Sequence, residues 1–250
     1  MPVDGEGLDV SALPATATLV YVTPSHQFPL GTPMSLARRT ALLGWAQRRG
    51  AVIVEDDYDS EFRFSGRPLE PLHSLDRTGR VVYVGTFSKT LLPMLRLGFL
   101  VAPASLQPAL RTAKQLTDWH GDHTSQAALA RFIDSGELPR HIRRATRVYA
   151  ARHRLITAAL HGELARWLDP VPSAAGLHLC ARLRPEVPVD PGRVLDRARQ
   201  RGVAAESLAA YCAGQPQAGL VLGYGSIRTE HVAEGLRLLA ACFRDEPTDG

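Results

Sequence analysis

The basic residues of this 250-residue chain are almost all arginine. Lys and Arg together number 29, and Lys89 and Lys114 are the two lysines among them. Arginine stays protonated and forms no imine, whereas a desolvated lysine amine can attack a carbonyl carbon. Both lysines are therefore candidates for amine chemistry. Lys114 lies in a helical pattern that predicts a solvated surface position, so Lys89 is the stronger candidate.

The residues around Lys89 could hold a phosphate group. The segment GTFSKT runs from Gly85 to Thr90 after the apolar run VVYV, and Arg96 stands seven residues beyond Lys89. Hydroxyl, lysine and arginine side chains together can cradle a phosphate. The GxxxxGK[ST] motif of a P-loop is absent. Taken by itself, this segment is equally typical of a polar turn with a surface lysine.

Acidic residues follow another apolar run, AVIV. The segment EDDYDSEFR begins at Glu55 and contains Asp56 and Tyr58. Such a cluster is usual in a solvated turn or a cation site, but an EF-hand loop is excluded because Phe62 stands where that loop needs glycine. Clustered carboxylates also suit a ligand with a protonated ring nitrogen.

The two polar segments together supply the groups that pyridoxal phosphate requires. These groups are a lysine for the imine, an acid for the pyridinium nitrogen, and hydroxyls with an arginine for the phosphate. In open α/β sheets, ligands bind outside the carboxyl ends of the strands, where both segments are expected to lie. No metal site is expected, because His120, His123 and His178 lack ligand spacing and the three cysteines form no CxxC pair.

Strands alternating with helices are predicted for the first part of the chain, which indicates an α/β fold with a mostly parallel sheet. The helices show apolar residues at helical spacing, and Ser35 and Gly50 mark the ends of the first of them. The predicted strands are Thr16–Val22, Ala51–Val54, Val81–Val84 and Leu97–Val101, and the predicted helices are 35–50, 106–119 and 125–135.

The second part of the chain has an α+β pattern. A long basic helix, Pro139–Leu168, leads into it. We therefore expect a partial large domain over 1–138, a connecting helix over 139–168 and a smaller C-terminal domain over 169–250. The strands predicted there are Gly176–Leu183, Val203–Ala205 and Gly219–Tyr224, and the helices are Asp190–Arg201 and Arg228–Phe243.

Composition excludes several classes of protein. Hydrophobic residues make up 45% and charged residues 22% of the chain, which is typical of a globular protein and not of a disordered one. No run approaches the ~18 apolar residues that a transmembrane helix needs. The first ten residues lack the apolar stretch of a secretory signal, so a cytoplasmic location is expected. The net charge of +4 suits an anionic partner or simply an arginine-rich surface.

Four segments resemble the aminotransferase-like half of MocR/GabR-type transcription regulators. In these proteins a winged-helix domain is fused to a domain of the fold-type-I, class I/II pyridoxal-phosphate-dependent aminotransferases. The resemblance covers nearly the whole chain and implies that fold, truncated at its start, and a homodimer. The segments are VTPSHQFPLGTPMSLARR, VIVEDDYDSEFRFSGRPLEPLHSLD, VYVGTFSKTLLPMLRLGFLVAP and HTSQAALARFIDSGELPRHIRRATRVYAARH.

The resemblance assigns roles to individual residues. Lys89 matches the Schiff-base lysine, Asp56 the acid on the pyridine nitrogen, and Tyr58 the tyrosine on the ring oxygen. The fold's usual asparagine after the first strand is not evident, and His26 and Gln27 stand near its position. The residues that match the phosphate cradle are Thr86, Ser88 and Arg96.

Three departures from the family pattern matter for function. The winged-helix domain is absent, so DNA contact is expected only through a domain that this chain lacks. The start of the fold, with its Gly-rich phosphate loop and its ring-stacking aromatic residue, is also missing, which suggests a fragment, a split gene product or a deliberately shortened chain. Val221 stands where aminotransferases usually place the arginine that grips the substrate carboxylate, with Arg228 nearby in sequence.

Three functions follow as expectations. The first is a domain that binds pyridoxal phosphate through Lys89 and senses the cofactor, an amine or an amino acid. The second is an active class I/II aminotransferase that transfers an amino group between an amino acid and a 2-oxo acid. The third is a truncated scaffold that no longer holds the cofactor. Turnover with an amino donor and a 2-oxo acid would distinguish the first two.

Overall fold

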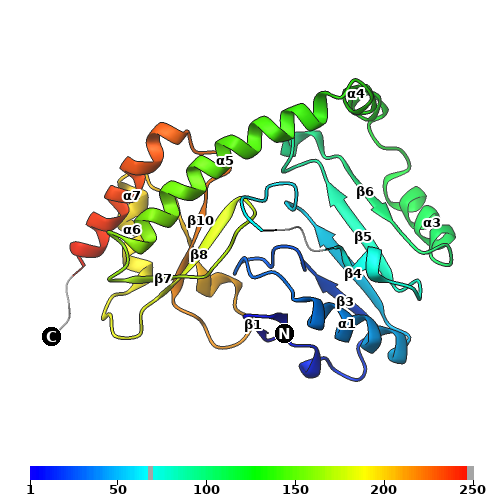
Figure 1. The fold of residues 1–250 in the computed structure, drawn as a ribbon, viewed down its shortest axis with the longest axis horizontal. Coiled ribbons are helices and arrows are strands. Elements are labelled where there is room, and N and C mark those ends of the chain that lie inside the picture. Colours follow the sequence, from blue (N-terminus) through cyan, green and yellow to red (C-terminus); the bar gives the residue numbers. More distant parts are fainter. Residues whose placement is uncertain (67–69, 247–250) are drawn as a thin grey trace. The chain divides into compact units, whose positions relative to one another are not determined.

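The structure is a computed structural model that describes residues 1–66 and 70–246 (Figure 1). The chain divides into two compact units. The first comprises Met1–Gln27 and Thr32–Ala145, and the second comprises Phe28–Gly31 and Thr146–Gly250. Among the described residues, no helix has the length and apolar character needed to cross a membrane.

A four-stranded sheet forms the centre of the first unit. Its strands are β3 (Leu19–Val22), β4 (Val52–Asp57), β5 (Val81–Thr86) and β6 (Gly98–Val101), in that order across the sheet (Figure 1). The first three strands are parallel, and β6 runs antiparallel to β5. This confirms the predicted α/β class with a mostly parallel sheet.

The ends of β4 and β5 differ from the prediction. β4 continues to Asp57 and β5 to Thr86, where the apolar runs predicted strand ends at Val54 and Val84. The apolar runs underestimate the length of these strands, because the residues that follow Val54 and Val84 still pair in the sheet. Asp56 lies opposite Val84, and Asp57 lies opposite Gly85. The acidic residues after AVIV therefore belong to a strand and not to a loop.

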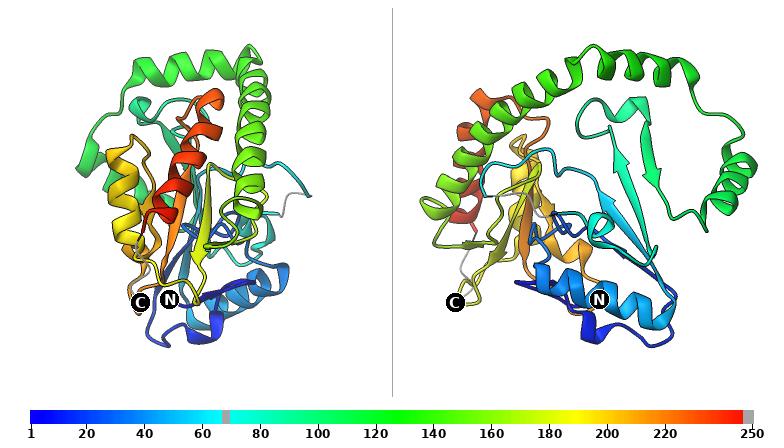
Figure 2. Two further views of the ribbon diagram at one scale, coloured as in Figure 1. Left: turned by 90° about the vertical axis from the view of Figure 1, so that its left-hand side faces the viewer. Right: turned by 45° about the vertical axis from the view of Figure 1, so that its right-hand side comes forward.

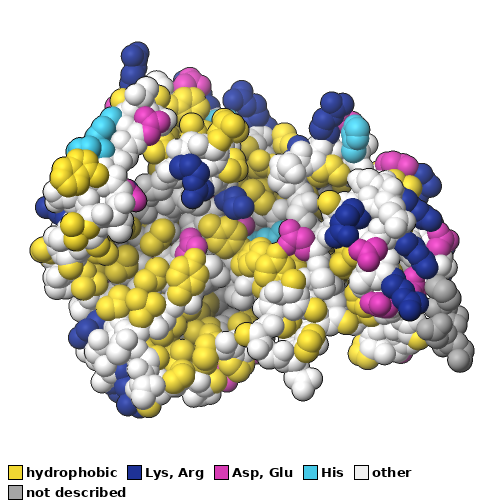
Figure 3. All heavy atoms as spheres, turned by 180° about the vertical axis from the view of Figure 1, so that it is seen from behind, with side chains coloured by type: hydrophobic (Ala, Val, Ile, Leu, Met, Phe, Trp, Pro, Cys, Tyr) yellow, Lys and Arg dark blue, Asp and Glu magenta, His cyan; other side chains and the backbone are white. Residues whose placement is uncertain are grey.

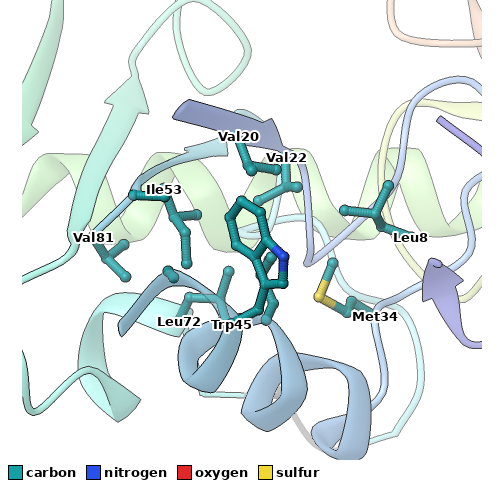
Figure 4. Close-up of a cluster of buried hydrophobic side chains, with 11 residues drawn as sticks. Leu8, Val20, Val22, Met34, Trp45, Ile53, Leu72 and Val81 are labelled. Atoms are coloured by element: carbon teal, nitrogen blue, oxygen red, sulfur yellow. The ribbon is translucent and has the colours of Figure 1, made fainter. Parts of the chain in front are cut away.

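Helix α1 (Leu36–Arg49) covers one face of this sheet. Its ends are as predicted: the Ser35 side chain accepts a hydrogen bond from the Arg38 N–H, and Gly50 adopts the left-handed conformation, with φ of 66°. Trp45 of α1 points into a buried cluster with Val20, Val22 and Ile53 of the strands (Figure 4). The apolar face of α1 thus fixes the side of the sheet that is buried.

The edge strand β6 is much less covered. Phe99 and Leu100 expose 47% and 52% of their surface, and hydrophobic side chains reach the surface over a wide area in the left half of Figure 3. The Phe99 ring lies directly over Gly85, so a Cβ at that position would come within 2.4 Å of the ring. A side chain at position 85 would therefore require the Phe99 ring to move aside, which glycine avoids.

Short elements and helices complete the first unit. They are the antiparallel pair β1 (Val3–Asp4) and β2 (Gly7–Leu8), the 3₁₀ helices at Val10–Ala12 and Pro93–Leu95, and the helices α2 (Leu72–Leu75), α3 (Gln107–Asp118) and α4 (His123–Asp134). The helices predicted over 106–119 and 125–135 are confirmed to within two residues.

Helix α5 (Glu137–His161) is a single uninterrupted helix that continues from the first unit into the second (Figure 2). It ends at His161, so the predicted end at Leu168 was wrong. Leu160, Leu164 and Leu168 are fully buried, and their spacing imitates a helical face. Beyond His161 these leucines instead pack from turns and from the start of a strand, β7 (Leu168–Pro170).

The second unit is a four-stranded antiparallel sheet with two helices. The strand order is β7, β8 (His178–Leu183), β10 (Gly219–Gly223) and β9 (Glu206–Ser207), and the helices are α6 (Pro191–Gln200) and α7 (Thr229–Arg244). The strand predicted at Val203–Ala205 is wrong. Val203 donates its N–H to the Ala198 carbonyl and closes the end of α6, so pairing begins only at Glu206. The 3₁₀ helix Leu208–Tyr211 follows.

Candidate functional site

Asp56 lies on the sheet face opposite α1, which we call the open face. Burial alternates along β4, and the parallel register pairs exposed Tyr21 with Val54, and buried Val22 with Glu55. The Tyr21 hydroxyl donates a hydrogen bond to Oδ2 of Asp56. The other carboxylate oxygen, Oδ1, has no hydrogen bond to any residue that the structure describes, so it can accept one from a ligand.

The neighbouring acids of β4 point the other way and are hydrogen-bonded within the fold, although Oδ1 of Asp57 is buried without a partner among the described residues. Both oxygens of the fully buried Glu55 accept backbone N–H groups of α2, each at 2.8 Å, and the Arg39 guanidinium lies 3.9 Å away. Oδ2 of Asp57 accepts hydrogen bonds from the hydroxyls of Tyr83 and Ser60, both at 2.7 Å. Of the three acids at the end of β4, Asp56 is the one presented on the open face.

Tyr58 and His26 are brought together just beyond the ends of β4 and β3. The Tyr58 hydroxyl donates to the His26 carbonyl at 3.0 Å, and Nδ1 of His26 lies 3.0 Å from a carboxylate oxygen of Asp59. His26 and Asp59 are each 1% exposed. Burial raises the pKa of Tyr58, and the carboxylates of Asp59, Asp56 and Asp57 raise it further. The phenol therefore stays protonated and can donate a hydrogen bond.

Gln27 closes the loop that contains His26. Its backbone N–H donates to the Thr32 carbonyl at 3.2 Å. This hydrogen bond connects the two segments of the first unit, which are separated in sequence by residues 28–31. The structure thus places both candidates for the missing asparagine near the carboxyl end of β3. His26 has a direct contact with Tyr58.

Lys89 lies in a turn that starts at the carboxyl end of β5. The Leu91 N–H donates to the Phe87 carbonyl at 2.8 Å, and a ring nitrogen of His141 lies 2.8 Å from the Thr90 carbonyl. These bonds fix the turn, while the Lys89 side chain itself is exposed and makes no ion pair with any residue in the described part of the chain. The backbone at Lys89 is therefore held in place, and the amine remains available.

The three residues predicted for phosphate binding line one open cavity of about 970 Å³. Thr86 orders this cavity's edge, because its hydroxyl accepts a hydrogen bond from the Ser88 N–H at 3.1 Å. Arg96 has a φ of 50°, which is uncommon for a residue with a side chain and is typical of a functional constraint. Thr86, Ser88 and Arg96 are thus brought together, and their role in binding a phosphate stays a prediction.

Four polar residues of α3, Gln107, Arg111, Lys114 and Gln115, line the same cavity and were not predicted to do so. Gln107, Arg111 and Lys114 lie four and then three residues apart, so they share one face of the helix. This spacing was the available signal, but it points to a cavity only when the position of the helix is known. Lys114 is exposed as predicted and forms an ion pair with Asp118.

The position expected to bind a substrate carboxylate lies in the second unit and has no charge. Val221 is 4% exposed within β10. Arg228 precedes α7 and pairs with Glu230 at 2.9 Å. The structure therefore assigns Val221 to the core of that unit and Arg228 to a surface ion pair.

Comparisons with known proteins identify the family of the chain. The family model described as aminotransferase class I and II matches residues 6–242. The probable rhizopine catabolism regulatory protein MocR of Rhizobium meliloti is 40% identical over 96% of this chain and 48% of its own length. The uncharacterized HTH-type transcriptional regulator YhdI of Bacillus subtilis is 39% identical over 90% of this chain and 48% of its own length.

A solved enzyme shares the fold. The kynurenine aminotransferase of Pyrococcus horikoshii superposes with a TM-score of 0.88 at 29% identity, covering 98% of this chain and 63% of that one. The chain therefore spans about half the length of the curated relatives it matches and under two thirds of this enzyme. Its fold type is that of the pyridoxal-phosphate-dependent aminotransferases.

Proposed function

Because this chain belongs to the class I and II aminotransferase family, we propose that it is the ligand-sensing domain of a MocR/GabR-type regulator and binds pyridoxal phosphate through Lys89. One observation carries the proposal: an unpaired lysine amine stands at the carboxyl end of β5, and the adjacent strand β4 presents a carboxylate oxygen without a hydrogen-bond partner among the described residues. Ligands bind at this edge of open α/β sheets.

The donor set fits the cofactor. Oδ1 of Asp56 can accept a hydrogen bond from a pyridinium N–H, and the protonated Tyr58 phenol would donate its single O–H to a ring oxygen in place of the His26 carbonyl. Thr86, Ser88 and Arg96 offer hydroxyl and guanidinium donors for the phosphate. When bound, pyridoxal phosphate supplies an electrophilic carbonyl and an electron-withdrawing ring. The residues of this chain would bind the cofactor, orient it and keep its ring nitrogen protonated.

The ligand that this domain senses would be the cofactor itself, an amine or an amino acid. Two relatives are named as regulators, which favours sensing over turnover. The apolar, buried Val221 also favours sensing, because it leaves no cation at the place expected for gripping a substrate carboxylate. By analogy with the family, the domain would act as a homodimer, and DNA would be bound through a separate winged-helix domain.

Active transamination is the second candidate. It is favoured by the structural similarity to the Pyrococcus horikoshii kynurenine aminotransferase and by the presence of Lys89, Asp56 and Tyr58. Purified protein loaded with pyridoxal phosphate should be given an amino donor and a 2-oxo acid. Sustained formation of the new amino acid would establish an enzyme, whereas a change in the cofactor spectrum without turnover would support a sensor.

A titration with pyridoxal phosphate tests cofactor binding directly. The wild-type chain should develop the visible absorption band of a lysine-linked cofactor, and Lys89→Ala should not. Lys114→Ala tests the other lysine and should keep the band, and weaker binding in this variant would reflect the place of Lys114 in the cavity lining. A band in the Lys89 variant that Lys114→Ala abolishes would reassign the attachment site. No band in any protein would support the third function, a scaffold without cofactor.

A further inference from the structure

We propose that Tyr21 is a positioning residue that aims the free oxygen of Asp56 at the cofactor's ring nitrogen. The inference rests on the proposed function, to which it adds a residue that the family resemblance did not assign. Tyr21 lies on β3, one strand away from Asp56, and its hydroxyl donates to Oδ2 of that carboxylate.

The strand register explains why this tyrosine reaches that carboxylate. Tyr21 pairs with Val54 in the parallel ladder between β3 and β4, so Asp56 is two residues farther along β4 on the same face. Side chains on neighbouring strands that are offset by two residues lie within reach of a long aromatic side chain. The contact therefore follows from the sheet itself and does not depend on a flexible loop.

The hydrogen bond distinguishes the two oxygens of Asp56. A carboxylate can accept several hydrogen bonds, so occupation of Oδ2 by Tyr21 leaves Oδ1 able to accept another. With Oδ2 anchored, rotation of the carboxylate is restricted and Oδ1 points in a defined direction. A ligand that donates a hydrogen bond to Oδ1 of Asp56 would then meet an acceptor whose orientation is already set. This lowers the entropic cost of binding.

The hydroxyl of Tyr21 has no structural role in the core. Tyr21 is 61% exposed, and Asp56 is its hydrogen-bond partner among the residues described. The other residues of β3, Leu19, Val20 and Val22, are aliphatic, so an apolar side chain would satisfy the strand. Partial burial and Asp56 raise the pKa of Tyr21 to about 12, so its hydroxyl remains a donor at neutral pH.

Tyr83 offers an internal comparison. It also donates to an aspartate of β4, Asp57, at 2.7 Å, but this pair lies on the face covered by α1. Tyr21→Phe and Tyr83→Phe therefore each remove one hydroxyl from one tyrosine–aspartate pair on opposite faces of one sheet. A general effect of losing such a hydrogen bond would appear in both variants, and a positioning effect would appear in the first alone.

The test measures the dissociation constant of pyridoxal phosphate and the pH midpoint of its visible band. Tyr21→Phe should bind the cofactor roughly three- to tenfold more weakly, as expected for the loss of one hydrogen bond to the binding carboxylate. It should also move the pH midpoint of the band, because the environment of the ring nitrogen changes. Tyr83→Phe should leave both values at those of the wild type. Unchanged values in Tyr21→Phe, or equal changes in both variants, would overturn the proposal.

A measurement without cofactor separates this inference from the proposed function. NMR of ¹³Cζ-labelled tyrosine at pH 10.5 should show a larger ionised fraction of Tyr21 in Asp56→Asn than in the wild type, because the partner charge is gone while the burial that also raises the pKa remains. If the wild type binds no pyridoxal phosphate, the proposed function fails, yet this result would still support the Tyr21–Asp56 pair. A Tyr21 resonance that titrates identically in both proteins would overturn the pair itself.

Discussion

The two faces of the sheet in the first unit carry similar acidic side chains that differ in their hydrogen-bond partners. On the face covered by α1, Glu55 is fully buried and both its oxygens accept backbone N–H groups of α2. On the open face, one strand position away, Asp56 keeps one oxygen without a partner among the described residues. The same strand thus holds an acid that completes the fold and an acid that is available to a ligand.

This difference shows how a strand can combine stability with function. Successive side chains point to opposite faces, so three consecutive acids are separated without any change in backbone conformation. Buried polar groups must be paired, because an unpaired buried charge is costly. An acid on a less covered face does not need a partner within the protein, because water can solvate it. Its carboxylate can therefore bind a ligand.

The largest effect should come from breaking the buried face. Glu55→Ala leaves the fully buried Arg39 without its nearest carboxylate and two N–H groups of α2 without acceptors. Removing one partner of a buried ion pair typically costs about 3–5 kcal/mol, so we expect a loss of this size in the free energy of unfolding. Urea denaturation followed by circular dichroism measures it.

Asp56→Ala is the matched control, because it truncates an acid of the same strand on the other face. We expect its free energy of unfolding to stay within about 1 kcal/mol of the wild-type value. If Glu55→Ala does not fold, Glu55→Gln provides the measurement, since the amide keeps one acceptor oxygen and should cost less. Equal losses in Glu55→Ala and Asp56→Ala would contradict the division between the two faces.

A smaller effect, and a different one, should come from the open face. Asp56→Asn keeps the shape of the side chain but removes the charge that would hold a pyridinium nitrogen. Hydrogen bonds to charged groups are worth about 1.5–3 kcal/mol, so affinity for pyridoxal phosphate should fall roughly ten- to hundredfold. Absorption titration gives the dissociation constant, and thermal unfolding without cofactor should be unchanged.

Asp134→Asn provides the control for this charge removal. Asp134 is an exposed residue at the end of α4, and it belongs neither to the Tyr21–Asp56 pair nor to the cavity lined by Thr86, Ser88 and Arg96. Its substitution should leave cofactor affinity at the wild-type value. Similar weakening in both variants would mean that net charge, and not a contact of Asp56, controls binding.

Much of the fold was predictable because its signals are local. The ends of α1 follow from Ser35 and Gly50, and the centres of the four strands follow from short apolar runs. The polar ends of β4 and β5 were missed because pairing continued after the apolar residues stopped. The end of α5 was missed because Leu164 and Leu168 continue a helical spacing while packing from turns and a strand.

Some residues of the candidate site could be singled out from the sequence, but their roles stay predictions and their geometry could not be predicted. The spacing around Lys89 and the match to a known family identified Thr86, Ser88 and Arg96, which line one cavity. The Tyr21–Asp56 bond depends on the register between β3 and β4, which joins residues 35 positions apart. No local pattern encodes this register, and a tyrosine inside an apolar strand is predicted only to pack against its neighbours.

The smallest predicted effect concerns Asp76, at the opposite end of β5 from the candidate site. Its carboxylate accepts the N–H groups of Thr78 and Val81, each at 2.8 Å. Partial burial opposes ionisation, but the backbone hydrogen bonds outweigh it and lower the pKa of Asp76. An acid with a lowered pKa stabilises the fold above its unfolded pKa of about 3.9, and this stabilisation is lost as the pH falls through the lower folded value.

Asp76→Asn should therefore cost about 0.5–1 kcal/mol at pH 7, reduced by solvent screening, and the difference from the wild type should shrink below about pH 4. Urea denaturation at pH 7 and pH 3 measures both values, while cofactor affinity at pH 7 should not change. A loss of affinity in this variant would show that the two ends of β5 are coupled, and the separation of stability from binding would then not extend along the strand.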